Sequence, residues 1–455
     1  MDEPATLSLS SDLTSDPSAR TSDFLHLVLL WARREPERVG ECASVKRSHI
    51  LGRGVERLPD DPPQLEWVRA RPGANEPTGA LSTPTLSRRQ WRLVPANDAI
   101  DVENLGRRQL FHNGVQAQRC RARVGDTLGV GGVALFLVSK RPAFLPPFPF
   151  TPFDFGGADA DGMVGETPES WLVREELTRL AAHPSHCLVL GESGSGKELC
   201  VRAIHARSAR ASGPFVARNA ATIPTSLVEA ELFGQAANYP NPGAGARKGL
   251  VGLADGGTLF LDEIGEMGEL QQANLLRLLD AGQYQRLGED RLRTCELRVM
   301  GATNRDPSLL KPDLLARFPE RLLLPGLNAR RADVPLLVRS IIQRLFEQGA
   351  LTELPQLGMD LIDALVRHDY TLHFRELERL VRLSAQAPAG EPWTLNKALA
   401  SELNPTPSQA ALDIAQVRLA LETSKNASEA AERLGLTNRY ALYRLMKQLG
   451  LERTP

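Results

Sequence analysis

The sequence predicts three domains: an all-β domain, a central parallel α/β domain and an all-α helix-turn-helix. Short apolar runs broken by Gly, Pro and Asn fill residues 21–142, which is a strand pattern. From 163 to 385, strand-like runs alternate with amphipathic helical patterns, as in a parallel sheet with crossover helices. Residues 411–455 contain two short helical patterns around a glycine. A chain of 455 residues is also too long for one ordinary domain.

Composition limits the class of protein. Hydrophobic residues make up 42% and charged residues 24%, and the net charge is −1, so a nucleic-acid site must be a local patch. The cysteines are few and scattered, which argues against a disulfide framework or a zinc site and indicates a reducing compartment. The N-terminus lacks a signal-peptide pattern, and "FLHLVLLWA" is too short to span a bilayer. We expect a cytoplasmic protein with no membrane partner.

The domain boundaries follow the breaks in these patterns. Residues 1–20 are polar, and we expect them to be disordered. The runs "LHLVLLWA", "QWRLVPA" and "DTLGVGGVALFLV" are the clearest strands of the first domain. A Pro/Phe/Gly-rich linker at 143–162 cannot form a helix or a central strand, and a second Ala/Pro/Gly linker occupies 386–410.

The stretch "HCLVLGESGSGKE" predicts a nucleotide site. Gly191, Gly196 and Lys197 have P-loop spacing between a strand and a helix. Glycines let successive backbone N–H groups face phosphate oxygens, and the lysine reaches the β- and γ-phosphates. The alternative is a glycine-rich turn with a chance lysine. The predicted ATP ligands are Gly191, Glu192, Ser193, Gly194, Ser195, Gly196, Lys197 and Glu198.

A carboxylate pair completes this site. "GGTLFLDEIGE" places Asp262 and Glu263 at the end of an apolar strand, about 65 residues after the P-loop. We expect Asp262 to hold Mg²⁺ and Glu263 to orient or activate the attacking water. Glu198 replaces the usual Ser/Thr, so other groups must help to hold the metal. "LRVMGATN" ends at Thr303 and Asn304, at the sheet edge where ligands bind.

Seven segments, in order and spacing, resemble the AAA+ domain of bacterial sigma-54-dependent transcriptional activators (enhancer-binding proteins). They are "GESGSGKE", "AIHARSAR", "LVEAELFG", "LADGGTLFLDEIGE", "LLRLLDAGQYQRLG", "VMGATNRD" and "RRADVPLLV". The resemblance covers about 163–385, and Glu198 is itself typical of the family. It implies an ATPase with a helical lid from about residue 328 and a homo-oligomeric ring, usually a hexamer. It also implies that DNA and the RNA polymerase sigma-54 holoenzyme are partners.

The resemblance also implies roles for single residues. Asn219 in "ARNAAT" would switch the catalytic Glu263, Asn304 would be a sensor, and Arg375 in "FRELERL" would be a second sensor in the lid. Arg317 matches one arginine of the family's arginine-finger segment; without the family it would be a surface arginine. The second position holds Lys311, which keeps the charge but loses the bidentate fork. The family's Gly-Asn-Val-Arg-Glu-Leu is changed here to "LHFREL".

Three segments of the first domain, "HILGRG", "LSRRQW" and "NLGRRQLFHNG", resemble the signatures of a forkhead-associated (FHA) domain. That family is a β-sandwich that binds phosphothreonine peptides, so a phosphothreonine-containing protein is an implied partner. Arg53 and Arg88 would neutralise the phosphate, and Ser87 would donate a hydrogen bond. The alternative is a sandwich that makes protein contacts without phosphate.

The first domain departs from the FHA pattern at two places. Gln90 stands at the family's structural histidine, and the peptide-contacting asparagine has only Arg108 or Gln109 nearby. The Asn113–Gly114 pair matches. The fold is therefore predicted more directly than the binding.

The C-terminal segment predicts a DNA-binding helix-turn-helix. A helix over 428–434 ends at Gly435, and a second helix starts near Asn438 with basic residues and no acid. It resembles the factor-for-inversion-stimulation type. The alternative is an amphipathic dimerising hairpin. The predicted DNA contacts are Asn438, Arg439, Tyr440, Arg444 and Lys447.

The loop "ELFGQAANYPNPGAGARKG" raises a question about activity. In the resembled family it is a hairpin whose Gly-Ala-Phe-Thr-Gly-Ala tip touches sigma-54. The loop has the family's length, but the Phe and Thr positions hold Pro240 and Asn241. The prolines stiffen the tip, and only Tyr239 could supply an aromatic contact. The loop therefore predicts weak or absent sigma-54 remodelling. The alternative is a contact retuned for a divergent sigma factor or another client.

Together the sequence predicts a cytoplasmic, ATP-dependent transcription regulator tuned by threonine phosphorylation. One alternative is an ATP-binding, DNA-bound regulator or repressor that no longer remodels sigma-54. Another is an ATPase that acts on a client outside transcription, which the helix-turn-helix disfavours.

Overall fold

The structure is a computed structural model of the 455-residue chain. It describes residues 23–54, 62–224, 227–385 and 390–403, and isolated positions between 417 and 446. Within the described part, no helix is long and apolar enough to cross a membrane. The predicted DNA contacts lie outside the described residues: Asn438, Arg439, Tyr440, Arg444 and Lys447. The expected disordered segment 1–20 also lies outside them.

The first domain consists of two antiparallel sheets, as the interrupted apolar runs predicted. The eight-stranded sheet has the order β5-β4-β2-β1-β12-β11-β8-β9. Its strands are β1 (Asp23–Ala32), β2 (Cys42–Ser44), β4 (Val68–Arg71), β5 (Ala74–Pro77), β8 (Leu110–His112), β9 (Val115–Ala117), β11 (Thr127–Val130) and β12 (Ala134–Pro142). The four-stranded sheet, in the order β10-β7-β6-β3, contains β3 (His49–Leu51), β6 (Trp91–Ala96), β7 (Ala99–Asn104) and β10 (Arg119–Arg123).

Large aromatic side chains fill the space between these sheets. Phe136 on β12 stacks on Trp67 at 5.3 Å between ring centroids and meets Trp91 of β6 edge-on at 5.6 Å. All three are buried, and such aromatic pairs add to the free energy gained from burial. The turn between β8 and β9 is formed by Asn113 and Gly114 with φ of 51° and 79°, the geometry that tight hairpins require.

The central domain has the predicted parallel sheet. Five strands pair in parallel in the order β14-β15-β18-β13-β19. They are β13 (Cys187–Leu190), β14 (Phe215–Asn219), β15 (Thr258–Asp262), β18 (Arg298–Thr303) and β19 (Glu320–Leu323). The inner strands are apolar over most of their length and almost entirely buried, as expected where helices cover both faces of a parallel sheet. The helices are α1 (Pro168–Ala182), α2 (Lys197–Arg207), α3 (Val228–Phe233), α4 (Gly249–Leu253), α5 (Glu269–Ala281) and α6 (Pro312–Ala316).

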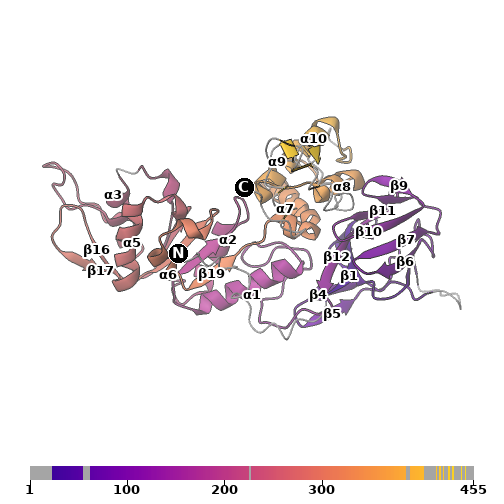
Figure 1. The fold of residues 1–455 in the computed structure, drawn as a ribbon, viewed down its shortest axis with the longest axis horizontal. Helices are drawn as coiled ribbons and strands as arrows, with labels where there is room; N and C mark the ends of the chain where they lie inside the picture. The colour runs from indigo at the N-terminus through magenta and orange to yellow at the C-terminus, as the bar shows by residue number, and fades with distance from the viewer. Residues whose placement is uncertain are drawn as a thin grey trace.

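A helical subdomain follows the parallel sheet. It contains α7 (Val334–Glu347), α8 (Met359–Arg367), α9 (His373–Ser384) and α10 (Lys397–Glu402). Figure 1 shows this subdomain between the N-terminal sheets and the parallel sheet, while the hairpin of β16 (Gln283–Gln285) and β17 (Leu292–Thr294) lies at the opposite end of the molecule. The subdomain can therefore contact both of the larger domains.

The helical subdomain packs directly on the eight-stranded sheet. One apolar cluster combines Val28 and Leu30 of β1 with buried residues of α7 and α8. Polar contacts reinforce it: Trp31 Nε1 donates to the Leu357 carbonyl at 2.8 Å, and Thr127 Oγ1 donates to Asp363 Oδ1 at 2.5 Å. The two domains therefore share a core.

Residues 143–162 also hold the domains together. Phe150 and Phe153 pack on Trp171 of α1, at 4.9 Å and 5.6 Å between ring centroids. Arg71 of β4 bonds to the carbonyl of Phe153 at 2.7 Å and to Glu166 at 2.5 Å. Between β12 and α1 the chain, which is described throughout, forms no helix or longer strand, as its prolines predicted, but it contacts both domains.

Candidate nucleotide site

The P-loop connects β13 to α2. Gly194 and Gly196 have φ of 80° and 103°, a region in which a side chain would be strained, so glycine is required at both positions. Lys197 is buried, and its Nζ donates to the carbonyls of Gly191 at 2.9 Å and Glu192 at 3.3 Å. The loop is thus curled around the lysine ammonium group.

Two features of this loop suit a phosphate ligand. The Ser195 hydroxyl is buried and has no hydrogen-bond partner among the described residues. A Cβ on Gly196 would meet nothing within 4 Å, so the space beside the loop is open. Because the loop precedes the N-terminus of α2, its N–H groups and the helix dipole favour an anion. The residues present therefore fit the phosphates of a nucleotide.

The carboxylate pair lies next to the lysine. Glu263 has a left-handed φ of 52°, which turns the chain sharply at the end of β15. Its Oε1 is 3.9 Å from Lys197 Nζ, and its Oε2 accepts from the backbone N–H of Asn304 at 3.3 Å. Asp262 Oδ1 accepts from the Glu263 N–H at 3.0 Å. The structure therefore brings together residues of three strand ends that are far apart in sequence.

The donor set fits a metal held jointly with phosphate. Asp262 and Glu263 supply carboxylate oxygens, which Mg²⁺ prefers. Among the described residues, no group of three or more potential protein ligands surrounds a metal position. A magnesium ion here would therefore need phosphate and water oxygens to complete its shell, as is usual for metals bound with ATP.

Asn219 lies on the strand next to this pair, and its side chain makes no hydrogen bond with Glu263 among the described residues. It is the last residue of β14 and pairs in register with Asp262 of β15. Its Oδ1 accepts from the Ala221 N–H at 2.9 Å, which caps the short 3-10 helix Ala220–Thr222. Asparagine commonly caps a turn in this way. In the described residues its side chain is thus used locally, and no hydrogen bond joins it to Glu263.

The helical subdomain closes over the P-loop through the start of α9. The Phe374 N–H donates to the Gly194 carbonyl at 3.1 Å, and Arg375 Nη1 donates to Ser193 Oγ at 3.2 Å. His373, at the altered family position, pairs through Nε2 with the Glu192 carboxylate. Arg375 therefore lies at the predicted site, and His373 adds a contact that no sequence motif indicated.

Glu376 fixes this turn from the opposite side. Its carboxylate accepts from the N–H groups of Thr371 at 2.7 Å and Leu372 at 3.0 Å and pairs with His368 at 3.0 Å. Burial alone would raise the pKa of Glu376, but these hydrogen bonds outweigh burial and lower the pKa to about 2. The ionised carboxylate thus holds Leu372 against the P-loop. The sequence points to Glu376 only indirectly, because the Arg-Glu-Leu end of the family motif is kept after the altered residues.

The arginine-finger candidate lies on another surface. Arg317 is the C-cap of α6, and its Nε is 2.5 Å from Asp280 Oδ1 of α5, with both side chains about half exposed. Lys311 is the N-cap of the same helix, and its backbone N–H donates to Gln272 Oε1 at 3.0 Å. Both predicted positions therefore flank one short, accessible helix.

The three FHA-type candidates meet at one end of the first domain. The Arg53 N–H donates to the Ser87 carbonyl at 3.1 Å, and the Ser87 hydroxyl accepts from the Arg107 N–H at 3.2 Å. Arg53 Nε is buried without a partner among the described residues. Arg88 and Arg107 are exposed at this same end. Arg107 belongs to the FHA-like segment "NLGRRQLFHNG", but no role was predicted for it from the sequence.

Gln90 organises these loops. It is fully buried, and its Nε2 donates to Asn104 Oδ1 and to the Arg108 carbonyl, each at 2.9 Å. Its amide therefore ties two loops together at the position where the resembled family has histidine. Asn113 lies elsewhere: its carbonyl accepts from Arg367 Nη1 of α8 at 2.7 Å. That residue belongs to the contact with the helical subdomain.

The loop after α3 folds back on itself. The Asn238 N–H donates to the Ala244 carbonyl at 2.7 Å, and Asn238 Oδ1 accepts from the Gly243 N–H at 3.0 Å. Tyr239 is 39% exposed, and its ring covers Gly288, where a Cβ would lie 2.4 Å from it. The one aromatic residue of the tip thus rests on the neighbouring β16–β17 hairpin.

Comparison with known proteins places the central domain in a family. Residues 163–317 match the model of the sigma-54 interaction domain. The chain is 39% identical over 240 residues to the Nif-specific regulatory protein of Bradyrhizobium diazoefficiens, covering 51% of this chain and 40% of that protein. It is 35% identical over 305 residues to the transcriptional regulatory protein ZraR of Escherichia coli K12, covering 63% and 68%.

A solved structure of NtrX from Brucella abortus in complex with ATP is 31% identical, with a TM-score of 0.48, covering 64% of this chain and 70% of that chain. Of the two curated relatives, the chain spans less than half the length of the Nif-specific protein and about two thirds of the length of ZraR. The N-terminal sheets lie outside the matched family segment. With 35% identity across 68% of ZraR, this chain belongs to the family of bacterial transcriptional regulators that carry a sigma-54 interaction domain.

Proposed function

We propose that this chain is an ATP-hydrolysing transcription regulator of the AAA+ type. The observation that carries the proposal is the convergence of Lys197, Glu263 and the Asn304 backbone at the strand ends, beneath a helical lid that contacts the P-loop. These groups bind phosphate, polarise water and report the nucleotide state in ATPases of this kind.

The residues divide the work by position. The P-loop N–H groups and Lys197 bind the β- and γ-phosphates. Asp262 lies at the end of β15, at the same edge of the sheet as the P-loop. Glu263 is held beside Lys197 and orients the attacking water. A bound magnesium ion would neutralise phosphate charge there. Asn219, one strand over, moves from its turn to Glu263 when it acts as the switch.

The ring arrangement is part of the proposal. Arg317 and Lys311 flank α6, and among the described residues Arg317 pairs with Asp280 of α5 and not with its own P-loop. We infer that they act on the nucleotide of a neighbouring subunit in a homo-oligomer, as the hexameric family does. Lys311 supplies charge there but cannot grip a phosphoryl group with two parallel bonds.

The first domain is proposed to be an FHA domain that reads phosphothreonine. Arg53, Ser87 and Arg88 gather at one end of the sandwich, and the buried Arg53 Nε, which has no partner among the described residues, favours an anionic ligand. The same sandwich shares a core with α7 and α8. At a different place in the same domain, the Asn113 carbonyl accepts from Arg367 of α8, so the domain that would bind phosphothreonine is bonded directly to the helical subdomain.

The loop after α3 favours a second version of the function. Its tip lacks the Phe-Thr pair, and Tyr239 packs on Gly288. An ATP-binding, DNA-bound regulator with weak or absent sigma-54 remodelling fits this geometry. The helix-turn-helix that would hold DNA remains an expectation from the sequence.

Nucleotide binding and ATP turnover test the enzyme proposal. Lys197→Ala should abolish ATP binding, because it removes the ammonium group that reaches the phosphates. Glu263→Gln should bind ATP but not hydrolyse it, because the amide cannot act as a base. Unchanged ATP affinity in Lys197→Ala would contradict the site.

An open-complex assay with the sigma-54 holoenzyme separates the two versions of the function. We expect little or no ATP-dependent open complex with the native protein. Robust open complexes that are lost when Tyr239 and Pro240 are replaced would show instead that the loop engages sigma-54.

A further inference from the structure

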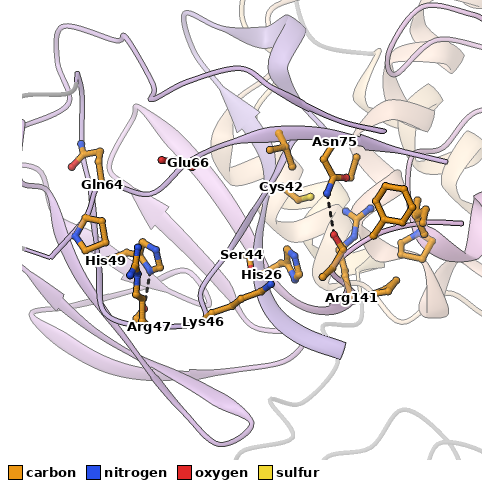
Figure 2. A pocket seen from close by; sticks show the side chains of 18 residues that line it. His26, Cys42, Ser44, Lys46, Arg47, His49, Gln64, Glu66, Asn75 and Arg141 are labelled. Atoms are coloured by element: carbon orange, nitrogen blue, oxygen red, sulfur yellow. Dashed lines mark hydrogen bonds between the residues drawn. The ribbon is translucent and has the colours of Figure 1, made fainter. Parts of the chain in front are cut away.

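A cavity of about 260 Å³ opens on the outer side of the eight-stranded sheet. Its walls come from β1, β2, the start of β3, β4 and β5, from the end of β12 and the chain that follows it, and from Pro168 at the start of α1. Figure 2 shows His26, Ser44, Lys46 and Arg141 among the side chains that line it. None of the described residues assigned to nucleotide or phosphothreonine binding lines this cavity.

The cavity wall is strongly cationic. Lys46, Arg47 and Arg141 line it, against one acidic residue, Glu66. The whole chain has a net charge of only −1, so this excess of positive charge is local. Cavity walls of one sign, next to a low-dielectric interior, concentrate ions of the opposite sign.

Arg141 is the least expected of the three cations. It is 3% exposed, and its Nη2 donates to the Glu166 carbonyl at 2.9 Å. Among the described residues, no carboxylate forms an ion pair with its guanidinium. Glu169 interacts with Arg141 only at longer range, and burial raises the pKa of that carboxyl group. Burying a guanidinium without an anionic partner costs free energy that one neutral hydrogen bond does not offset. An anion in the cavity would remove this cost.

Neutral polar side chains also line the wall, and Ser44 and His26 are two of them. Ser44 Oγ is buried and has no hydrogen-bond partner in the described part of the chain. The neighbouring His26 is bonded through Nδ1 to the Phe24 carbonyl at 2.9 Å. Burial lowers the pKa of His26 to about 4, so this ring is neutral at pH 7 and its Nε2 can accept a hydrogen bond. The wall can therefore pair with hydroxyl groups as well as with charge.

We propose that this cavity is a binding site for a small organic anion, such as a hydroxy acid or a sugar-acid phosphate. Arg141 and Lys46 pair with its carboxylate or phosphate oxygens, and Ser44 and His26 pair with its hydroxyl groups. The volume lies just below the range of drug-sized pockets, which favours a small ligand. Arg141 also bonds to Glu166, which Arg71 holds, so the ligand would sit at the joint between the two domains.

Thermal unfolding and calorimetry of the full chain test this proposal. The probes are inorganic phosphate, citrate and 3-phosphoglycerate, each titrated at constant ionic strength set with NaCl. A ligand that binds only the folded state raises the midpoint in proportion to the logarithm of its concentration. We expect citrate or 3-phosphoglycerate to stabilise the protein. The double variant Lys46→Ala/Arg47→Ala should bind at least fivefold more weakly.

Two matched variants locate the effect. Arg92→Ala/Arg123→Ala removes two exposed cations from the four-stranded sheet and should leave binding unchanged. Arg53→Ala/Arg88→Ala alters the proposed phosphothreonine face and should also leave it unchanged. Absence of stabilisation by any probe at 20 mM would overturn the proposal. Loss of binding in Arg53→Ala/Arg88→Ala would also overturn it, because the anion would then bind at the phosphothreonine face. The same holds if both control variants weaken binding as much as Lys46→Ala/Arg47→Ala does.

Discussion

Gly194→Ala should separate the lid from the P-loop. Gly194 has φ of 80°, and a Cβ there would lie 2.1 Å from the carbonyl oxygen of Leu372. That carbonyl belongs to the turn that Glu376 holds in place. The substitution therefore disturbs the contact between the P-loop and the lid. It does so without requiring a clash with a bound phosphate.

The size of the effect follows from two contributions. The left-handed backbone costs roughly 1–2 kcal/mol for a residue with a Cβ. The two atoms must also separate by about 1.3 Å, the difference between 2.1 Å and the 3.4 Å at which ordinary contact begins. Backbone atoms on both sides prevent relief by a rotamer change. Because a misplacement of about 1 Å can reduce turnover by a factor of about 10², we expect ATP hydrolysis to fall about a hundredfold.

Gly349→Ala is the matched control for this prediction. Gly349 follows α7 in the same subdomain, with φ of 72° and nothing within 4 Å of a Cβ. Gly349→Ala should lower the free energy of unfolding by the same cost of a left-handed backbone, but it should keep the native rate of ATP hydrolysis. Steady-state ATPase rates and hydrogen exchange at residues 371–375 measure the two effects. Equal ATPase rates in the two variants would refute the proposed lid contact.

Three further predictions concern the lid, the domain contact and the loop. The pKa of Glu376 is lowered to about 2, so its ionised carboxylate contributes its full stabilisation above pH 4.5, the usual pKa of glutamate. That stabilisation is lost as the pH falls toward 2. In acid-unfolding curves, Glu376→Gln should therefore lack this pH-dependent loss. Arg367→Ala should lower the free energy of unfolding, measured by urea titration, by about 1.5–3 kcal/mol. The reason is that it removes the charged donor at 2.7 Å from the Asn113 carbonyl. An unchanged free energy of unfolding would argue against a shared core. Gly288→Ala should displace the ring of Tyr239 and raise hydrogen exchange over 235–249, while exchange in α2 stays constant.

Local patterns were enough to predict the class of the first two domains and some of their strands and helices. Strict spacing identified the P-loop around Lys197, and the structure confirms a strand before it and a helix after it. Apolar runs of four or five residues, as at β13 and β15, predicted buried parallel strands because helices cover both faces of such a sheet. Interrupted runs predicted the antiparallel sheets of the first domain. These inferences depend on neighbours in sequence and need no knowledge of distant contacts.

Contacts between distant segments could not be predicted in this way. No pattern around Asn113 indicates that its carbonyl meets Arg367, 254 residues later. Asn219 has the residue type that the family predicts, yet its amide caps the next turn. His373 was noticed only as a departure from a motif, and its contact with Glu192 depends on how the lid packs.

Residue types at fixed spacing were sufficient to predict an antiparallel β domain followed by a parallel α/β domain with a P-loop. The helix-turn-helix and the weakened contact of the loop tip with sigma-54 stay predictions from the sequence. The folded chain was needed to find that the first domain and the lid share a core, and that Arg141 lines a cationic cavity without a carboxylate partner among the described residues. Burial and pairing depend on side chains that the fold brings together from hundreds of residues apart. A buried charge is therefore recognised as unusual only when all of its neighbours in space are known.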